Sequence, residues 1–229
     1  MPTRAELDEF QQEADNLRTL AVSALVVHWL DNVAGSPADA LEELRQFVLD
    51  TVAEYGQAAA AVAVDFYNSV RPAGSPPFNP VPVVRADLVL PGSLNWTTSP
   101  LLTDDWQKAL DRSAAEIQKD IYAAMVDTIG EAATEDPLDV RFARWPRNPD
   151  PCAWCVLRAS KGAVYWSETT AERGDHLKCG CEVTPIFPGE PLPYQRKPYM
   201  TQFQAGAAEA DGPGRKALLS GMRRANGTR

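Results

Sequence analysis

All four cysteines of this 229-residue chain fall within 30 residues, and one of its two histidines lies among them. Cys152 and Cys155 form a C-x-x-C pair, and "HLKCGC" at residues 176–181 supplies a second set of candidate ligands. The C-x-x-C spacing lets two sulfurs reach one ion, and an H-x-x-C turn can do the same from the far side. We therefore predict a structural zinc site with four ligands drawn from Cys152, Cys155, His176, Cys179 and Cys181. His176 is a strong fourth ligand, and Cys181 can replace it.

Other uses of clustered thiols have specific requirements. Two disulfides are an alternative if the protein matures into an oxidising extracellular particle. The polar, acidic start of the chain does not resemble a secretory signal, however, and favours a reducing compartment. A redox C-x-x-C is expected to start a helix within a βαβ unit, and a Cys–His nucleophile does not account for four thiols. An HNH-type nuclease needs a further pair of ligands, and the other histidine, His28, is far away in the sequence.

Apolar residues repeat at helical spacing in three long stretches before the cysteines. They predict a helical hairpin over residues 1–71 and a long helix over residues 103–135. A proline-rich extended connector is predicted over residues 72–102. Ser36 followed by Pro37 is typical of a helix start, and Thr103 is the expected cap of the third helix. The first 135 residues are thus predicted to form an elongated body of three main helices.

The sequence pattern changes after Pro137. Three short strand-like segments, "DVRFARWPR", "GAVYWS" and "CEVTPIF", surround the cysteines and predict a small β-rich Cys/His module over residues 138–190. Modules of this size often cannot build an adequate core from apolar residues alone. Residues 191–229 have the composition of a basic flexible tail. The predicted fold class is therefore α+β, with an N-terminal helical body, a zinc-knuckle module and a tail.

The net charge of −9 is unevenly distributed. Residues 1–150 hold 24 Asp and Glu against 11 Lys and Arg, whereas residues 195–229 hold 2 against 7. The acidic body should repel nucleic acid, because phosphate contacts need Lys and Arg. The basic tail, residues 196–229, is suited to contact DNA, RNA or an acidic protein surface. No run of 18 apolar residues is present, so no membrane span is predicted.

The stretch "RFARWPRNPDPCAWCVLRASKGAVYWS…DHLKCGCEVTPIF" resembles the C-terminal module of MuF-like minor head (minor capsid) proteins of tailed phages, particularly those of actinobacteria. The shared pattern covers residues 138–187 and includes a C-x-x-C, a glycine turn, a V-Y strand and a His-x-x-Cys-x-Cys segment. Lys161 and the pair Leu177-Lys178 depart from it, at positions that are not ligands. The resemblance implies a virion structural protein made in the host cytoplasm and located in the phage head. Its expected partners are the portal protein and the major capsid protein, in an assembly with several copies.

Two functional hypotheses follow. The first is a portal-associated structural protein that acts in head assembly and in DNA packaging or delivery. The second is a zinc-ribbon protein that binds nucleic acid or has a regulatory role. The near-neutral module and the acidic body argue against this second hypothesis, because nucleic-acid binding needs a basic face. No phosphate-binding glycine loop or paired catalytic carboxylates stand out, so no enzyme is predicted.

Overall fold

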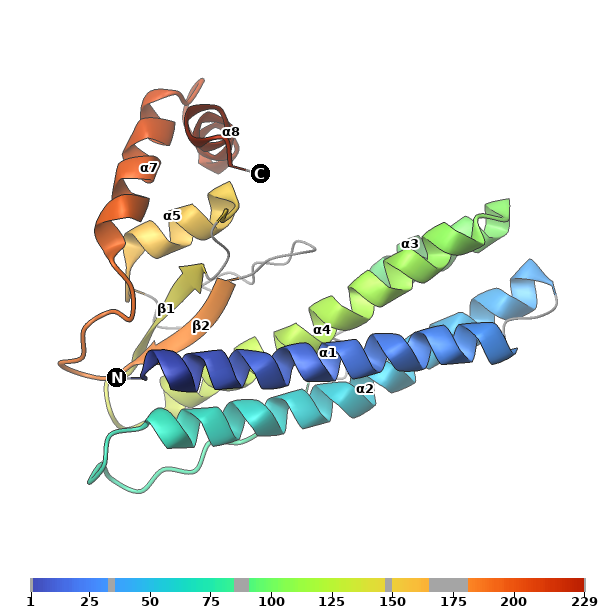
Figure 1. The fold of residues 1–229 in the computed structure, drawn as a ribbon, viewed down its shortest axis with the longest axis horizontal. Helices are drawn as coiled ribbons and strands as arrows, with labels where there is room; N and C mark the ends of the chain where they lie inside the picture. The colour runs from blue at the N-terminus through green and yellow to red at the C-terminus, as the bar shows by residue number, and fades with distance from the viewer. Residues whose placement is uncertain (1, 33–35, 85–90, 147–149, 165–180, 229) are drawn as a thin grey trace. The chain divides into compact units, whose positions relative to one another are not determined.

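The computed structural model describes residues 2–32, 36–84, 91–146, 150–164 and 181–228. Helices predominate among them (Figure 1). The chain divides into two compact units, and each is described by itself. In chain order the elements are α1 (Arg4–Asn32), α2 (Pro37–Val70), α3 (Pro91–Thr98), the 3-10 helix η1 (Ser99–Thr103), α4 (Trp106–Glu135), β1 (Arg141–Pro146), α5 (Ala153–Lys161), β2 (Cys181–Ile186), α7 (Arg196–Ala208) and α8 (Arg215–Asn226).

The first unit, called the helical bundle, comprises residues 5–66 and 81–128. The three main helices predicted from the sequence are present, and α1, α2 and α4 run side by side (Figure 1). Phe10 of α1 stacks on Phe66 near the end of α2, with ring centroids 4.2 Å apart. At the other end of α1, Trp29 meets Trp106 edge-to-face at 5.9 Å. These contacts make α1 antiparallel to both of its neighbours.

The predicted helix starts have different outcomes. Ser36 does cap α2, because its Oγ accepts the backbone N–H of Asp39 at 3.3 Å. The prediction for α4 is wrong by two residues, since the cap is Asp105, whose Oδ1 accepts the N–H of Lys108 at 3.2 Å. Thr103 instead ends η1, where its hydroxyl donates to the carbonyl of Pro100. A carboxylate also complements the positive end of the helix dipole, which a hydroxyl does not.

The second unit, called the C-terminal unit, comprises residues 1–4, 67–80 and 129–229. Its sheet is one antiparallel pair in which Arg141 of β1 lies opposite Ile186 of β2. Beside it, α5, α7 and α8 form a cluster of three helices with its own apolar core. Four buried residues make the centre, and five half-buried ones surround it: Ala153, Val156, Leu157 and Met222, with Trp154, Tyr199, Phe203, Leu218 and Leu219.

The predicted α+β fold class, with a β-rich zinc-knuckle module and a flexible tail, is therefore wrong. The C-x-x-C segment starts helix α5, and residues 196–208 and 215–226 of the predicted tail are the helices α7 and α8. Among the described residues the strands amount to one two-stranded sheet, and no group of three or more His, Cys, Asp or Glu side chains is placed to hold a metal ion. Of "GAVYWS", residues 162–164 are not in a strand and the rest lies outside the described residues.

A closed polar network holds the end of α2 to the end of α4 within the C-terminal unit. The fully buried carboxylate of Asp136 accepts two bonds from Arg71, at 2.7 and 3.1 Å, and one from the Tyr67 hydroxyl at 3.1 Å. The backbone N–H of Leu138 adds a fourth at 2.9 Å. Burial alone would raise the pKa of Asp136, but these hydrogen bonds outweigh it and lower the pKa.

Candidate functional site

The described half of the cysteine cluster lies at the start of α5. Cys152 is the N-cap, and its Sγ accepts the backbone N–H of Cys155 at 3.4 Å. The Cys152 thiol also lies 3.3 Å from the sulfur of Cys155, which is buried. Two sulfurs bound to one zinc at about 2.3 Å would be roughly 3.8 Å apart, so this pair can share an ion after a small adjustment. With both cysteines reduced, the two sulfurs therefore fit one half of a tetrahedral site.

The other half of the predicted site lies outside the described residues, as do His176, Cys179 and the side chain of Cys181. Zinc binding by Cys152, Cys155 and these three residues therefore stays a prediction. Cys155 is disulfide-bonded in the structure, whereas Cys152 carries a thiol. The disulfide alternative, which requires two such bonds, is therefore supported at Cys155 but not at Cys152.

The C-x-x-C segment meets one of the two requirements of a redox motif. The C-x-x-C pair does start a helix that follows a strand, which is part of what a redox motif requires. The strand before it, β1, pairs antiparallel with β2, however, and does not form the parallel βαβ unit of thioredoxin-like proteins.

Two groups of basic residues lie on the helices α5, α7 and α8. Arg158 is buried, and its guanidinium lies 4.2 Å from the ring centre of Trp154, with Arg215 over the same ring at 5.1 Å. These two cations stack on an indole within the three-helix cluster. The second group lies on α7 and α8 and includes the exposed residues Lys197, Lys216, Arg223 and Arg224; Arg196 of α7 is exposed as well. Arg224 pairs with Asp211 at 2.8 Å. The sequence indicated this positive charge, but not the helices that carry it.

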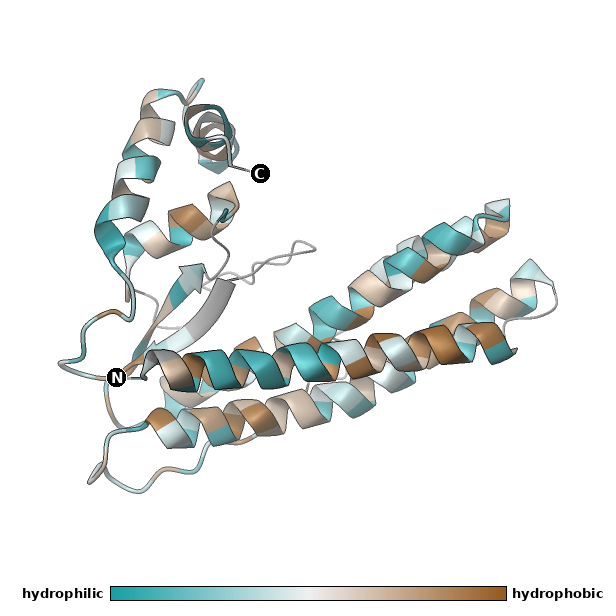
Figure 2. Ribbon diagram, viewed as in Figure 1, coloured by the Kyte–Doolittle hydropathy of each residue, from teal (hydrophilic) through white to brown (hydrophobic). Residues whose placement is uncertain are grey.

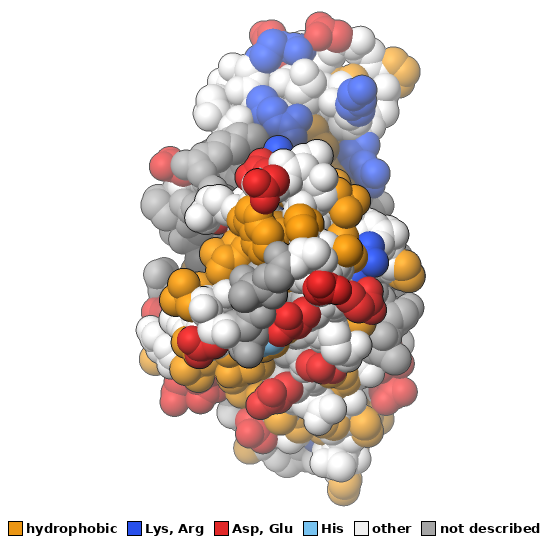
Figure 3. Space-filling model, turned by 90° about the vertical axis from the view of Figure 1, so that its right-hand side faces the viewer, with side chains coloured by type: hydrophobic (Ala, Val, Ile, Leu, Met, Phe, Trp, Pro, Cys, Tyr) orange, Lys and Arg blue, Asp and Glu red, His pale blue; other side chains and the backbone are white. Residues whose placement is uncertain are grey.

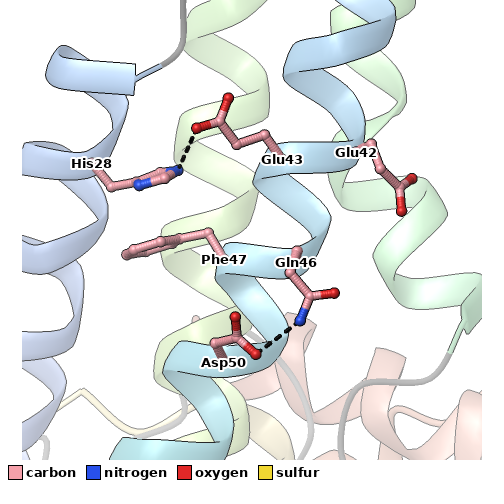
Figure 4. Close-up of a pocket in the computed structure, with 6 residues that line it drawn as sticks. All are labelled: His28, Glu42, Glu43, Gln46, Phe47 and Asp50. Atoms are coloured by element: carbon pink, nitrogen blue, oxygen red, sulfur yellow. Dashed lines mark hydrogen bonds and ion pairs between the residues drawn. The ribbon is translucent and has the colours of Figure 1, made fainter.

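The helical bundle has a shallow, open hollow of about 430 Å³ between α1 and α2 (Figure 4). Its floor is a stacked pair, with the ring of His28 4.0 Å from that of Phe47. The His28 Nε2 lies 3.6 Å from a carboxylate oxygen of Glu43. Glu42, Gln46 and Asp50 complete the lining, and Gln46 donates to Asp50 at 2.8 Å. The rim of the hollow is therefore acidic.

Helix α1 exposes a line of large apolar side chains, in which Val27 directly precedes His28 of the hollow. Leu20, Val27 and Leu30 are 56 %, 59 % and 77 % exposed, at spacings of seven and three residues. The second half of α1 is correspondingly brown in Figure 2, while its first half is largely teal. Figure 3, which views the bundle from the end where α1 stops, shows hydrophobic side chains interleaved with carboxylates. The sequence signal for this feature is "AVSALVVHWL" at residues 21–30, which has more apolar residues than one buried stripe uses.

None of the helices in the described part of the chain is long and apolar enough to cross a membrane.

Of the comparisons with known proteins, the one with protein-family models gives a match. No curated protein and no solved structure matches the chain. The family model described as "VG15 protein" matches residues 1–206, which include the helical bundle and the C-terminal unit as far as α7. The chain therefore belongs to the VG15 protein family, a family of viral gene products.

Proposed function

We propose that the protein is a structural component of the phage head, a minor head protein of the MuF-like type that is associated with the portal. It would act in head assembly and in DNA packaging or delivery. Membership of a viral gene-product family over residues 1–206 is the observation that carries the proposal. The MuF-like resemblance of residues 138–187 supports the finer assignment, since it falls inside the matched range.

The helical bundle supports a role in contacts between proteins. Its helices α1, α2 and α4 have 29, 34 and 30 residues, or roughly 45–50 Å each at 1.5 Å per residue. The bundle also exposes large apolar side chains on α1, which monomeric proteins rarely gather in one place. Portal and major capsid proteins are the partners that we propose for this surface.

We also infer a structural rather than catalytic role for the buried ionisable groups of the bundle. Lys119 lies 2.7 Å from Glu116 and 3.3 Å from Asp120, both of which are buried. Burial would lower the pKa of Lys119, but the two carboxylates outweigh it and the pKa is raised, so the amine stays charged. Glu116 also accepts a hydrogen bond from Ser93. Paired charges of this kind stabilise helix packing.

Packaged DNA is a further proposed partner, through the exposed basic residues of α7 and α8. Deleting residues 205–229 would also remove Met222 from the core, so substitution is the sharper test. The variant K197E/K216E/R223E is expected to weaken DNA binding and to flatten its salt dependence, because each phosphate that a cation neutralises adds about 0.9 to the slope of log K against log salt concentration. Fluorescence anisotropy with a short duplex at several salt concentrations measures both. Unchanged binding and slope would exclude this surface as a DNA-binding site.

The main test is made on virus particles. Mass spectrometry of purified particles of the virus that encodes the chain is expected to find it in far fewer copies than the major capsid protein. Deleting its gene is expected to reduce the fraction of DNA-filled heads seen by electron microscopy, and supplying the wild-type chain should restore it. A chain that is abundant in infected cells but absent from purified particles would refute the proposal.

A further inference from the structure

We propose that the exposed apolar line of α1 (Leu20, Val27 and Leu30), together with the acidic hollow beside it, binds an amphipathic helix of another protein that carries Lys or Arg beside its apolar face. This docking surface lies entirely within the helical bundle. The inference deepens the proposed function, on which it rests, because it names the surface and the chemistry of the partner that a head protein would contact.

The apolar part of the surface has the length and spacing of a helix-binding seam. From Leu20 to Leu30 α1 rises about 15 Å, or roughly three turns, and its exposed side chains recur at helical spacing. Val26 lies next to this line and is 40 % exposed. An amphipathic partner helix with apolar residues at i, i+3 or i+4, and i+7 presents the matching pattern. Covering these side chains removes apolar area from water, which favours binding.

The charges around the seam select a basic partner. Three carboxylates, those of Glu42, Glu43 and Asp50, line the hollow on α2. Arg45, the basic residue in this part of α2, lies 3.8 Å from Glu42 but donates to Asn95 and Thr98 of α3. Over the whole bundle, residues 5–66 and 81–128 hold 19 Asp and Glu against 6 Lys and Arg.

The same charges disfavour a second copy of this chain as the occupant. Pairing two of these faces would bring the carboxylates beside α1 of one copy close to those of the other. Opposed like charges destabilise an interface, whereas Lys or Arg at the edge of a partner helix would meet this rim favourably. The surface potential therefore matches a basic helix.

The test uses the purified full-length protein and two synthetic 18-residue helical peptides. Both have leucines on one face, and the other face carries lysines in the first peptide and glutamates in the second. Binding is measured by isothermal titration calorimetry at low and moderate salt. The variant V27S/L30S removes part of the seam, and E42K/D50K reverses two charges of the rim. The matched control is E9K/E13K, which makes the same charge change at exposed positions in the first half of α1.

The lysine peptide is expected to bind and the glutamate peptide to bind at least about tenfold more weakly, because the rim is acidic. We expect V27S/L30S and E42K/D50K each to lower the affinity for the lysine peptide by about tenfold or more. The control E9K/E13K should lower this affinity by less than about threefold. Equal weakening by E9K/E13K would mean attraction to net charge alone and would overturn the inference. So would equal binding of both peptides, or no binding. Self-association that V27S/L30S abolishes would make a second copy the occupant and would also overturn it.

This test can fail separately from the proposed function. Absence of the chain from virus particles would refute the head assignment while leaving the peptide result intact. Absence of peptide binding would refute this docking surface while leaving the particle result intact.

Discussion

Replacing Asp136 by alanine should destabilise the protein more than any exposed substitution, because it breaks the closed network of the C-terminal unit. The carboxylate accepts hydrogen bonds from Arg71, from the hydroxyl of Tyr67 and from the backbone N–H of Leu138. Its side chain is fully buried and that of Arg71 is 11 % exposed. D136A therefore leaves a nearly buried guanidinium and a buried phenol without their acceptor.

The structure sets the size of the effect. Removing one partner of a buried ion pair costs about 3–5 kcal/mol. The exposed edge of Arg71 can regain some hydration, so we place D136A near the lower end, at about 3 kcal/mol of unfolding free energy. The double variant R71M/D136A should recover roughly 1–2 kcal/mol of this loss, because it also removes the unpaired cation.

Urea unfolding followed by circular dichroism gives these free energies, and hydrogen exchange of residues 129–146 shows whether the loss is local. The matched control is D139A, which removes an exposed carboxylate 3.9 Å from Arg141. A surface pair of this kind contributes about 0–1 kcal/mol. If D136A costs no more than D139A, the Asp136 network is not holding α2 to α4 and this reasoning is wrong.

Three further predictions concern stability. G206A should lower the free energy of unfolding by about 1–3 kcal/mol, because a Cβ there would lie 2.2 Å from Met222 Cγ. Hydrogen exchange in α7 and α8 should become faster. The control G92A, where a Cβ would have nothing within 4 Å, should be neutral or stabilising by up to about 1 kcal/mol. Because the pKa of Asp136 is lowered in the folded state, its carboxylate stabilises the fold at pH values above the unfolded-state pKa of about 3.9. This stabilisation is lost as the pH falls through the lower pKa of the folded state. Acid unfolding curves of D136N should therefore be flatter below about pH 4 than those of the wild type. S36A should cost about 0.5–2 kcal/mol by removing the cap of α2, as measured by thermal unfolding.

The long helices could be predicted because their apolar residues repeat over many turns. Leu7, Phe10 and Ala14 of α1 and Ile117 and Ile121 of α4 are buried as their spacing indicated. The exposed line on the second half of α1 was missed, because a helix pattern does not show which of two apolar faces the rest of the chain will cover.

The helices of the C-terminal unit could not be predicted in the same way. Both α7 and α8 are short, with 13 and 12 residues, and neither would be stable alone in water. They are stabilised by contact with α5, where Met222 becomes buried against Val156 and Leu157. Gly206 and Gly221 allow α7 and α8 to approach closely. The amino-acid composition of residues 191–229, from which a flexible tail was predicted, does not indicate this contact.

The segment around Cys152 shows why one motif supported two structures. A sulfur three residues before a backbone N–H can cap a helix, and the same C-x-x-C spacing can hold a metal ion. The two roles make different demands on residue 152. Serine satisfies the first and fails the second, because its hydroxyl is a preferred N-cap but not a typical zinc ligand.

Comparing C152S with C152A therefore separates capping from metal binding. Both variants lose the sulfur, so the difference between them measures the cap alone and should favour serine by about 0.5–2 kcal/mol. The difference between the wild type and C152S measures what the sulfur adds. If the zinc prediction is right, the wild type holds about one zinc per chain, and a chelator lowers its stability toward that of C152S, which the chelator leaves unchanged. Equal stability of C152S and C152A would refute the capping role. A wild type that holds no zinc and is insensitive to the chelator would refute the zinc prediction and leave α5 started by its cap alone.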